Sequence, residues 1–274
     1  MKRQLIQTEG AEKRPSAAPL PRSARQEACA DESEGILFAL AQAVEQRDSI
    51  TAGHCEGLAL TSLALGVGLC LDRPSLLALY RGGYLHDIGK VGIPDSILFK
   101  PGPLTAEEWV VMRSHAARGE EICRHVKSFA QVLPIIRHHH ERWDGSGYPD
   151  GLRGEQIPLL ARVLQIVDIY DALTNPRPYK PAFTAKQALR VIEEETACGW
   201  RDPEIVQVFL NIHSAVIVKV AEYSRRDEYD LQAMRASLTN LNQAFKSGLA
   251  PSSLNLDFLD NLDSQQAPNP PLCV

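Results

Sequence analysis

The sequence predicts an all-α protein, and three features of the chain support this fold class. In most segments apolar residues return at intervals of three and four, which is the period of an amphipathic helix. Alternation with period two is nearly absent, and only Ala215–Val220 could by itself be read as a strand. Capping residues, glycines and prolines separate the apolar segments. At 274 residues with 44% hydrophobic side chains, the chain can bury one main core.

The N-terminal part is predicted to contain a leader and three helices. Residues 1–30 hold three prolines among Ser, Ala and Arg, so we expect a flexible basic segment there. Apolar residues with helical spacing follow over 31–48 and again over 54–69. A third helix is predicted over 74–88, where Gly89 would end it.

The middle of the chain is predicted to contain two helices and a long loop. Thr105 and Glu108 have the spacing of a capping box, which would open a helix that carries His115. A further helix is expected over 134–140. Residues 143–154 contain four glycines and one proline, and this composition predicts a loop instead of a regular element.

The C-terminal part returns to helical spacing and then loses it. The spacing is found over 160–174, 185–197 and 203–245. After residue 248 the chain is rich in Pro, Ser, Asn and Gln, which favours a disordered tail or a short docking helix. The predicted organisation is a flexible leader at 1–30, a main domain at 31–213, a helical extension at 214–247 and a disordered tail at 248–274.

Composition and charge exclude several classes of protein. The six cysteines show no CxxC spacing, so we expect reduced thiols and a cytoplasmic location. No signal peptide or membrane span is predicted, because glycines and hydroxyl residues interrupt the longest apolar stretch, 58–71. A net charge of −5 argues against nonspecific binding of nucleic acid polymers. An anionic substrate would therefore need local cations or bound metal ions.

Histidines and aspartates recur in a pattern that suggests a metal centre. The candidate ligands are His86, Asp87, His115, His139, His140 and Asp168. Imidazole and carboxylate suit first-row transition metals, and one aspartate can bridge two ions. A single histidine is more often structural, so it is the joint occurrence that favours a two-metal site for phosphate ester chemistry.

Asp168 carries a further argument, because it lies in the almost wholly apolar segment Val163–Leu173. A bare carboxylate in such a place would be costly to bury. Metal coordination would remove this cost, and so would a salt bridge to Arg162 or Arg177. The sequence leaves both interpretations open.

Three cations follow the candidate ligands closely in the chain. Lys90 comes three residues after Asp87, while Arg177 and Lys180 come just beyond the segment that carries Asp168. Guanidinium and ammonium groups at these places could clamp phosphate oxygens. The alternative is that all three are ordinary solvated surface charges.

Several stretches of the chain carry a specific resemblance to a known family. They are Leu85–Pro94, Lys100–Thr105, His139–Pro149, Asp168–Thr174 and Arg177–Lys180. In order and spacing they resemble the HD-GYP family of bacterial cyclic di-GMP phosphodiesterases, a branch of the HD phosphohydrolase superfamily. A His-Asp pair alone is a weak signal, whereas a Gly147-Tyr148-Pro149 loop after a His-His-Glu run is highly specific.

The resemblance implies a helical bundle of the HD-domain type, so that 31–213 would be an HD-GYP phosphodiesterase domain. It implies two divalent metal ions, with iron or manganese as the usual choice. One ion would be held by His54, His86, Asp87 and Asp168, and the other by Asp87, His115, His139 and His140. Asp87 and Lys90 would be catalytic, and the substrate would contact Lys90, Tyr148, Arg177 and Lys180. The reaction would linearise cyclic di-GMP to pGpG, with GMP as an open further product.

The chain also departs from the family pattern. A glutamate that some members associate with a third metal is replaced by Ile50, so we expect two metal ions and not three. An arginine that is common three residues after the first ligand histidine is replaced by Gly57. The resemblance further suggests contacts between the Gly147-Tyr148-Pro149 loop and diguanylate cyclase domains. Two alternatives stay open: a non-catalytic cyclic di-GMP sensor or scaffold, and an HD phosphohydrolase for another cyclic dinucleotide.

Overall fold

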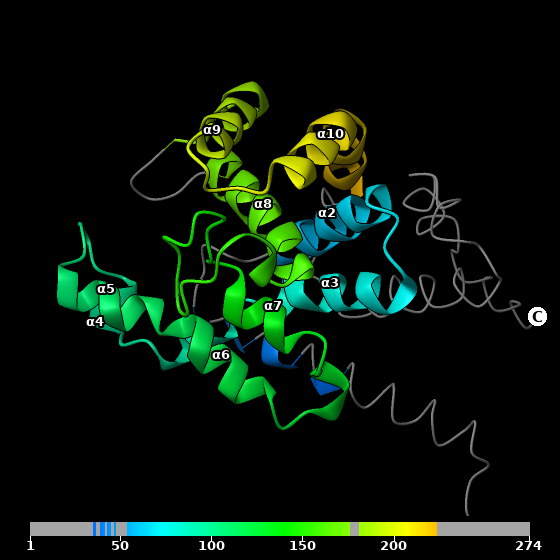
Figure 1. Cartoon of the computed structure of the whole chain (residues 1–274). Helices are drawn as coiled ribbons and strands as arrows, with labels where there is room; N and C mark the ends of the chain where they lie inside the picture. Colours follow the sequence, from blue (N-terminus) through cyan, green and yellow to red (C-terminus); the bar gives the residue numbers. More distant parts are fainter. Residues whose placement is uncertain are drawn as a thin grey trace, which may run out of the picture.

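The computed structural model describes residues 54–175 and 181–223, together with eight residues between 35 and 47 that are helical. Every regular element in these described parts is a helix, which confirms the predicted all-α class (Figure 1). The predicted leader at 1–30, the tail at 248–274 and the extension beyond Tyr223 lie outside the described residues.

Four longer helices form the centre of the molecule: α2 (His54–Gly68), α3 (Arg73–Leu85), α8 (Leu159–Thr174) and α10 (Pro203–Tyr223). Helix α2 packs against the other three, and α9 (Ala185–Ala197) packs against α8 and α10. The shorter helices α4 (Asp95–Leu98), α5 (Ala106–Arg113), α6 (His115–Cys123) and α7 (Leu133–His138) lie toward one side of this centre (Figure 1). Single 3₁₀ turns occur at η1 (Ile88–Gly92), η2 (Lys127–Phe129) and η3 (Gly154–Gln156).

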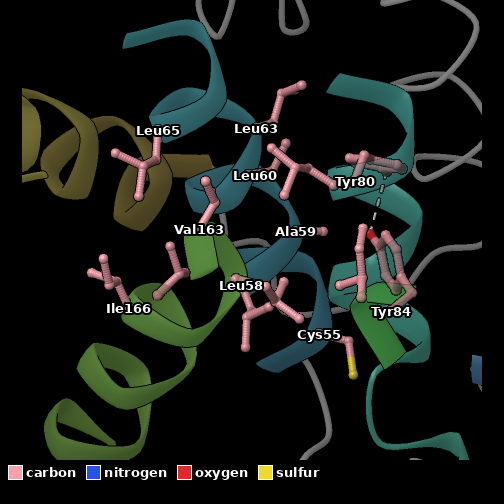
Figure 2. Packing of buried hydrophobic residues seen from close by; sticks show 14 of the residues in the cluster. Cys55, Leu58, Ala59, Leu60, Leu63, Leu65, Tyr80, Tyr84, Val163 and Ile166 are labelled. Atoms are coloured by element: carbon pink, nitrogen blue, oxygen red, sulfur yellow. Dashed lines mark hydrogen bonds between the residues drawn. The ribbon is translucent and has the colours of Figure 1, made fainter. Parts of the chain in front are cut away.

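Helix α2 is the central helix because almost its whole circumference is apolar. All eight residues from Leu58 to Leu65 are buried, so no face of this part of the helix is left for solvent. A helix that is apolar all round is stable only where other elements surround it. Figure 2 shows Leu58 and Leu63 of α2 among side chains of α3 and α8, such as Tyr80 and Val163. The apolar stretch in the sequence is therefore the core of the bundle.

Helices α2 and α3 approach each other closely at a glycine. A Cβ atom on Gly83 would lie 2.5 Å from the Cα atom of Ala59, so any larger residue would push the two helices apart. Beside this contact the hydroxyl groups of Tyr80 and Tyr84 lie 3.3 Å apart and satisfy each other inside the core (Figure 2). This packing fixes the C-terminal end of α3.

Helix boundaries near the histidines differ from the prediction. Helix α3 ends at Leu85 and not at residue 88, because the chain turns there to lay Gly89 against α6. A Cβ atom on Gly89 would lie only 1.9 Å from the carbonyl oxygen of His115. The next predicted helix breaks at Ser114, whose hydroxyl group donates to the carbonyl oxygen of Val111 and competes with the helical hydrogen bonds.

The remaining predictions of regular structure have mixed outcomes. The capping box of Thr105 and Glu108 is present, and α9 spans the predicted 185–197. Helix α7 ends at His138, two residues earlier than predicted. The segment 215–220 belongs to α10 and not to a strand, as the helical spacing over 203–245 predicts. No helix within the described ranges combines the length and the apolar character that crossing a membrane requires.

Candidate metal centre

Most of the predicted ligand residues lie at the ends of helices that converge on one place. His86 and Asp87 follow α3, His115 begins α6, and His139 and His140 follow α7. Asp168 comes from the middle of α8. His54 is the first residue of α2, but its side chain is not among those that the structure describes. Six of the seven predicted ligand residues can therefore be compared in space.

Asp87 lies at the centre of this group. Its Oδ1 atom is 3.3 Å from Nε2 of His115, and its Oδ2 atom is 3.3 Å from Nε2 of His86. An oxygen of Asp168 lies 3.8 Å from the same Nε2 atom. Because its two oxygens face different histidines, the Asp87 carboxylate has the orientation that a bridging ligand needs.

The second half of the group is formed by three histidines around Asp87. Nε2 of His115 and Nε2 of His139 are 3.5 Å apart, and the rings of His139 and His140 have centroids 4.0 Å apart. One potential ligand atom from each of Asp87, His115, His139 and His140 falls within 4.8 Å of the other three. This spacing suits a set of donors that surround a single cation.

The backbone fixes which nitrogen of each ring faces the group. Nδ1 of His86, His115 and His139 donates to the carbonyl oxygen three residues earlier, at distances of 3.0, 2.8 and 2.8 Å. A carbonyl oxygen can only accept, so each Nδ1 carries a proton, and Nε2 is the nitrogen that offers a lone pair whenever the ring is neutral. Second-shell hydrogen bonds of this kind orient histidine ligands in metal sites.

The donor set therefore fits a divalent cation. Nε2 of His86 is fully buried, and no described group meets it in hydrogen-bond geometry, although oxygens of Asp87 and Asp168 lie 3.3 and 3.8 Å from it. A buried polar atom without a partner is costly, and coordination to a metal ion would remove that cost. Histidine nitrogens combined with carboxylate oxygens are the chemistry that first-row transition metals favour.

Burial and neighbouring charges set the protonation of the group. Burial lowers the pKa of His139 to about 3, helped by His86 and His115, so this ring is neutral over the physiological range. Burial also lowers the pKa values of His115 and His140. His86 is the exception: burial opposes its charged form, but Asp87 and Asp168 raise its pKa to about 9. Metal binding must therefore displace a proton from His86.

Lys90 lies beside Asp87 through the 3₁₀ turn η1. Its Nζ atom is 2.6 Å from Oδ2 of Asp87. Burial disfavours the charged carboxylate, but Lys90 and then His86 hold the pKa of Asp87 well below its usual range. Arg47 donates to the carbonyl oxygens of Val91 and Ile93, which ties η1 to the N-terminal helical residues. The predicted catalytic pair, Asp87 and Lys90, is thus held as one unit.

The glycine-rich loop folds over the group through a buried carboxylate. Glu141 is completely buried, and its two oxygens accept hydrogen bonds from the amides of Asp150 (2.7 Å) and Leu152 (3.1 Å). Gln165 of α8 donates to the Glu141 carbonyl oxygen. A Cβ atom on Gly147 would lie 2.2 Å from the amide nitrogen of Arg142, so only glycine fits there. Glu141 therefore links the second half of the loop to the chain that precedes the loop.

An ion pair fastens the same loop from outside. Arg137 of α7 donates to both oxygens of Asp150 at 2.7 and 2.8 Å, and also to Glu120 of α6 at 2.6 Å. His138, Glu141 and Asp150 lie close enough to be considered as a second metal site. The carboxylate oxygens of this trio already accept hydrogen bonds from Arg137 and from backbone amides. We therefore infer that the trio stabilises the loop and does not bind a metal ion.

Tyr148 is the loop residue that faces the histidines. Its ring centroid lies 4.8 Å from that of His140 and 6.4 Å from that of His115. Its amide donates to the carbonyl oxygen of His140 at 3.2 Å. Burial and the charge of Asp87 raise the pKa of the Tyr148 hydroxyl group, which therefore stays protonated at neutral pH. The structure thus places Tyr148 at the edge of the candidate site.

Three other residues named in the sequence analysis cannot be located, and one expected partner of Asp168 pairs with a different residue. Arg177, Lys180 and Ile50 lie outside the described residues. Arg162, one of two alternative partners considered for Asp168, instead forms an ion pair with Asp202 at 2.6 Å.

Sequence reasoning assigned no role to Glu141, Gln165 or Arg137, although the structure gives each a clear one. For Glu141, a signal was available in its position between the histidine pair and a loop of four glycines.

Comparison with known proteins identifies relatives across the region just described. The family model described as HD domain matches residues 36–205. The chain is 41% identical over 176 residues to the cyclic di-GMP phosphodiesterase response regulator RpfG of Xanthomonas campestris, covering 64% of this chain and 46% of that protein. It is also 41% identical over 184 residues to 3'3'-cGAMP-specific phosphodiesterase 2 of Vibrio cholerae, covering 65% of this chain and 34% of that protein. The chain thus spans less than half of the length of these relatives.

Among solved structures, a cyclic GMP-AMP specific phosphodiesterase of Vibrio cholerae has a similar fold. The two structures have a TM-score of 0.55 and 18% sequence identity. The match covers 86% of this chain and 72% of the other. This likeness supports the helical architecture.

Proposed function

Because the chain belongs to the HD domain family, as its match over residues 36–205 shows, we propose that it is a metal-dependent phosphodiesterase for cyclic di-GMP. The reaction would open the ring to give pGpG, and a second hydrolysis would give GMP. The observation that carries the proposal is the group of Asp87, His115, His139 and His140, whose ligand atoms lie within 4.8 Å of one another.

The proposed cofactors are two divalent ions, with iron or manganese as the family suggests. His54, His86, Asp87 and Asp168 would hold one ion, and Asp87, His115, His139 and His140 the other. Such a pair supplies Lewis acidity, which activates water for attack and neutralises charge on the phosphate. The Nδ1 hydrogen bonds of His86, His115 and His139 leave Nε2 of each ring facing the site, which supports their use as ligands.

The protein side chains would bind and orient the phosphodiester. Lys90, already 2.6 Å from Asp87, would neutralise charge beside the attacked phosphate. Arg177 and Lys180 would bind phosphate oxygens from the segment after α8. Tyr148 would close the site from the loop side and keep bulk water out. Its protonated hydroxyl group is able to donate a hydrogen bond to the substrate.

A second candidate substrate is 3'3'-cGAMP. The chain is as similar to a relative named as specific for that dinucleotide as to one named as a cyclic di-GMP phosphodiesterase, at 41% identity in both cases. Cyclic di-GMP remains the first choice, because the Gly147-Tyr148-Pro149 loop and its surroundings carry the resemblance to the family of cyclic di-GMP enzymes.

The proposal also covers the domain boundaries, the cellular location and a protein partner. We place the catalytic domain at 31–213 and the protein in the cytoplasm, where the free cysteines at 55, 70, 123 and 198 would stay reduced. Diguanylate cyclase domains would bind at the Gly147-Tyr148-Pro149 loop, where Pro149 is exposed. A binding experiment with the Pro149→Ala variant would test that contact, and wild-type binding by this variant would contradict it.

The substrate is tested by measuring kcat/KM of the full chain for cyclic di-GMP and for 3'3'-cGAMP, with separation of the products. We expect pGpG as the first product from cyclic di-GMP and a lower kcat/KM for 3'3'-cGAMP. A higher kcat/KM for 3'3'-cGAMP would favour the second candidate. Tight binding of cyclic di-GMP by fully metal-loaded protein without turnover would instead favour a sensor or scaffold.

A further inference from the structure

A row of side chains leads from the candidate metal centre to the surface of α5. Next to His140 lies the ring of Tyr148, at 4.8 Å between centroids. The guanidinium carbon of Arg113 lies 5.3 Å from the Tyr148 ring centroid and 5.6 Å from that of Trp109. We call Trp109, Arg113 and Tyr148 the α5 rim. The rim is continuous with the place where the phosphodiester would be attacked.

The position of α5 relative to the metal centre is fixed at both ends of the helix. At its start, Glu108 closes the capping box with Thr105 and forms an ion pair with Lys100 at 2.5 Å. At its end, the carbonyl oxygen of Met112 accepts the Nδ1 proton of His115. The helix that carries Trp109 and Arg113 thus also orients a ligand histidine. The position of the rim is therefore fixed relative to the ligand histidine His115.

The chemical character of the rim is that of a site for a planar, electron-rich ligand. Trp109 is 45% exposed and Arg113 is also exposed, so both offer free surface. Within the described ranges, no carboxylate forms an ion pair with Arg113. A guanidinium group that rests on two aromatic rings keeps its planar set of N–H donors available. In a chain of net charge −5, such a cation beside the site indicates that a ligand binds there.

We propose that the α5 rim binds a guanine base of the substrate, an inference that rests on the proposed cyclic dinucleotide phosphodiesterase function. Trp109 would stack on the base, and Arg113 would donate two hydrogen bonds to O6 and N7 of guanine. Arginine recognises this pair of acceptors bidentately, whereas adenine presents an amino donor at the same edge. Base stacking on an exposed aromatic side chain adds affinity for any nucleobase.

A base fits the rim better than a phosphate group does. A phosphate would be drawn to the cations of the metal centre and Lys90, which lies 2.6 Å from Asp87. It has no flat face for the rings of Trp109 and Tyr148 to cover, and its oxygens would leave both aromatic surfaces in water. The combination of a donor fork with aromatic faces is instead the arrangement that proteins use for splayed-out bases.

The test compares kcat/KM of wild type and Arg113→Gln on four substrates. These are cyclic di-GMP, 3'3'-cGAMP, cyclic di-AMP and bis(4-nitrophenyl) phosphate, a phosphodiester without a purine. We expect a fall of about ten-fold or more for cyclic di-GMP, because the bidentate contact to guanine is lost. Glutamine matches the N6 and N7 edge of adenine, so kcat/KM for cyclic di-AMP should be unchanged or higher. Hydrolysis of bis(4-nitrophenyl) phosphate should not change.

Two further variants separate stacking from helix integrity. Trp109→Leu should lower kcat/KM for all three cyclic dinucleotides by about five-fold or more and leave bis(4-nitrophenyl) phosphate unaffected, while Trp109→Phe should retain most of the activity. Val110→Ala changes a 72% exposed residue of the same helix and should behave as wild type on every substrate.

The outcomes that overturn the inference differ from those that overturn the proposed function. Equal losses on all four substrates would mean that Arg113 only positions Tyr148, and no change on cyclic di-GMP would remove Arg113 from recognition; either result contradicts the α5 rim as a base site. A wild-type protein that hydrolyses bis(4-nitrophenyl) phosphate but no cyclic dinucleotide would instead contradict the proposed function.

Discussion

The apolar core around α2 and the polar group at the end of α3 are both buried, but they differ in what burial requires. In the core, Leu58, Leu63 and Leu79 contribute volume, and neighbouring helices enclose them. In the polar group, His86 and His115 are equally buried, yet each ring also has a hydrogen bond that sets its direction. In the core, a side chain must therefore have the volume that fits its neighbours. In the polar group, a histidine ring must have the orientation that its hydrogen bond sets.

This difference explains why the two regions should respond differently to substitution. Loss of a core side chain leaves a cavity and lowers the free energy of unfolding. Loss of a ligand side chain leaves the packing of the apolar core unchanged, so activity should fall far more than the free energy of unfolding. The following substitutions are arranged from the largest expected effect to the smallest.

Asp87→Asn should have the largest effect, and it should be on activity. The amide keeps the shape of the carboxylate but loses the charge that would bridge two cations. Two-metal sites supply several kilocalories per mole of charge stabilisation, so kcat should fall by about a thousand-fold or more. Metal content should fall with it, while the unfolding midpoint stays close to that of wild type. Glu194→Gln, at an exposed position of α9, is the matched control. Near-normal turnover by Asp87→Asn would contradict the assignment of Asp87 as a bridging metal ligand.

Leu79→Ala should have the largest effect on stability. The Leu79 side chain is completely buried between α3 and its neighbours. Removing it should lower the free energy of unfolding by about 2–5 kcal/mol. Urea unfolding followed by circular dichroism measures this. Leu159→Ala, at a 39% exposed position, should change the same quantity by less than about 0.5 kcal/mol. Equal effects of the two variants would show that α3 is not part of the core.

Glu141→Gln should open the glycine-rich loop without disturbing the core. One of the two amides that Glu141 now accepts from, those of Asp150 and Leu152, would face an NH₂ group instead. Leaving a donor without a partner costs up to about 1–3 kcal/mol when the donor is buried, and these two hydrogen bonds are partly buried. Hydrogen exchange should therefore become faster in the loop and stay unchanged in α2. Glu155→Gln, on the exposed turn beside the loop, is the control. Unaltered protection of Asp150 and Leu152 would refute the role of Glu141.

His213→Phe should have the smallest effect, visible only as a change in pH dependence. His213 is buried against Tyr170 and Phe209, and burial lowers its pKa below 6.5. The unfolded chain then binds more protons than the folded one below pH 6.5, so this histidine makes stability fall as the pH falls through that window.

Phenylalanine removes the titrating group but keeps the aromatic packing. The loss of unfolding free energy between about pH 7.5 and about pH 5 should therefore be smaller in His213→Phe than in wild type. His125→Gln, at an exposed histidine, serves as the comparison. Identical pH profiles of His213→Phe and wild type would exclude His213 as a contributor.

The same contrast explains what the sequence could predict. Helical spacing was sufficient for α8 and α9, since their patterns are local, and α8 begins one residue before its predicted start. The candidate ligands were recognisable because His and Asp residues of this kind recur in a specific motif. Their convergence on one site also follows from the resemblance to the family.

Long-range hydrogen bonds could not be predicted in this way. Glu141 accepts from amides nine and eleven residues later, and Arg137 meets Asp150 across the loop. Arg113 and Tyr148 are far apart in the sequence and meet only through the fold. The break at Ser114 depends on one side-chain hydrogen bond that competes with the helix. No local pattern encodes these contacts, so they become visible only in three dimensions.

The most direct test of the central claim measures metal content and turnover in the same sample. Protein purified without oxygen would be analysed for iron and manganese per chain and assayed with cyclic di-GMP, before and after removal of the metals by a chelator. The account predicts about two ions per chain, turnover that is lost on chelation, and turnover that returns when iron or manganese is restored. Hydrolysis of cyclic di-GMP that persists in metal-free protein would contradict it.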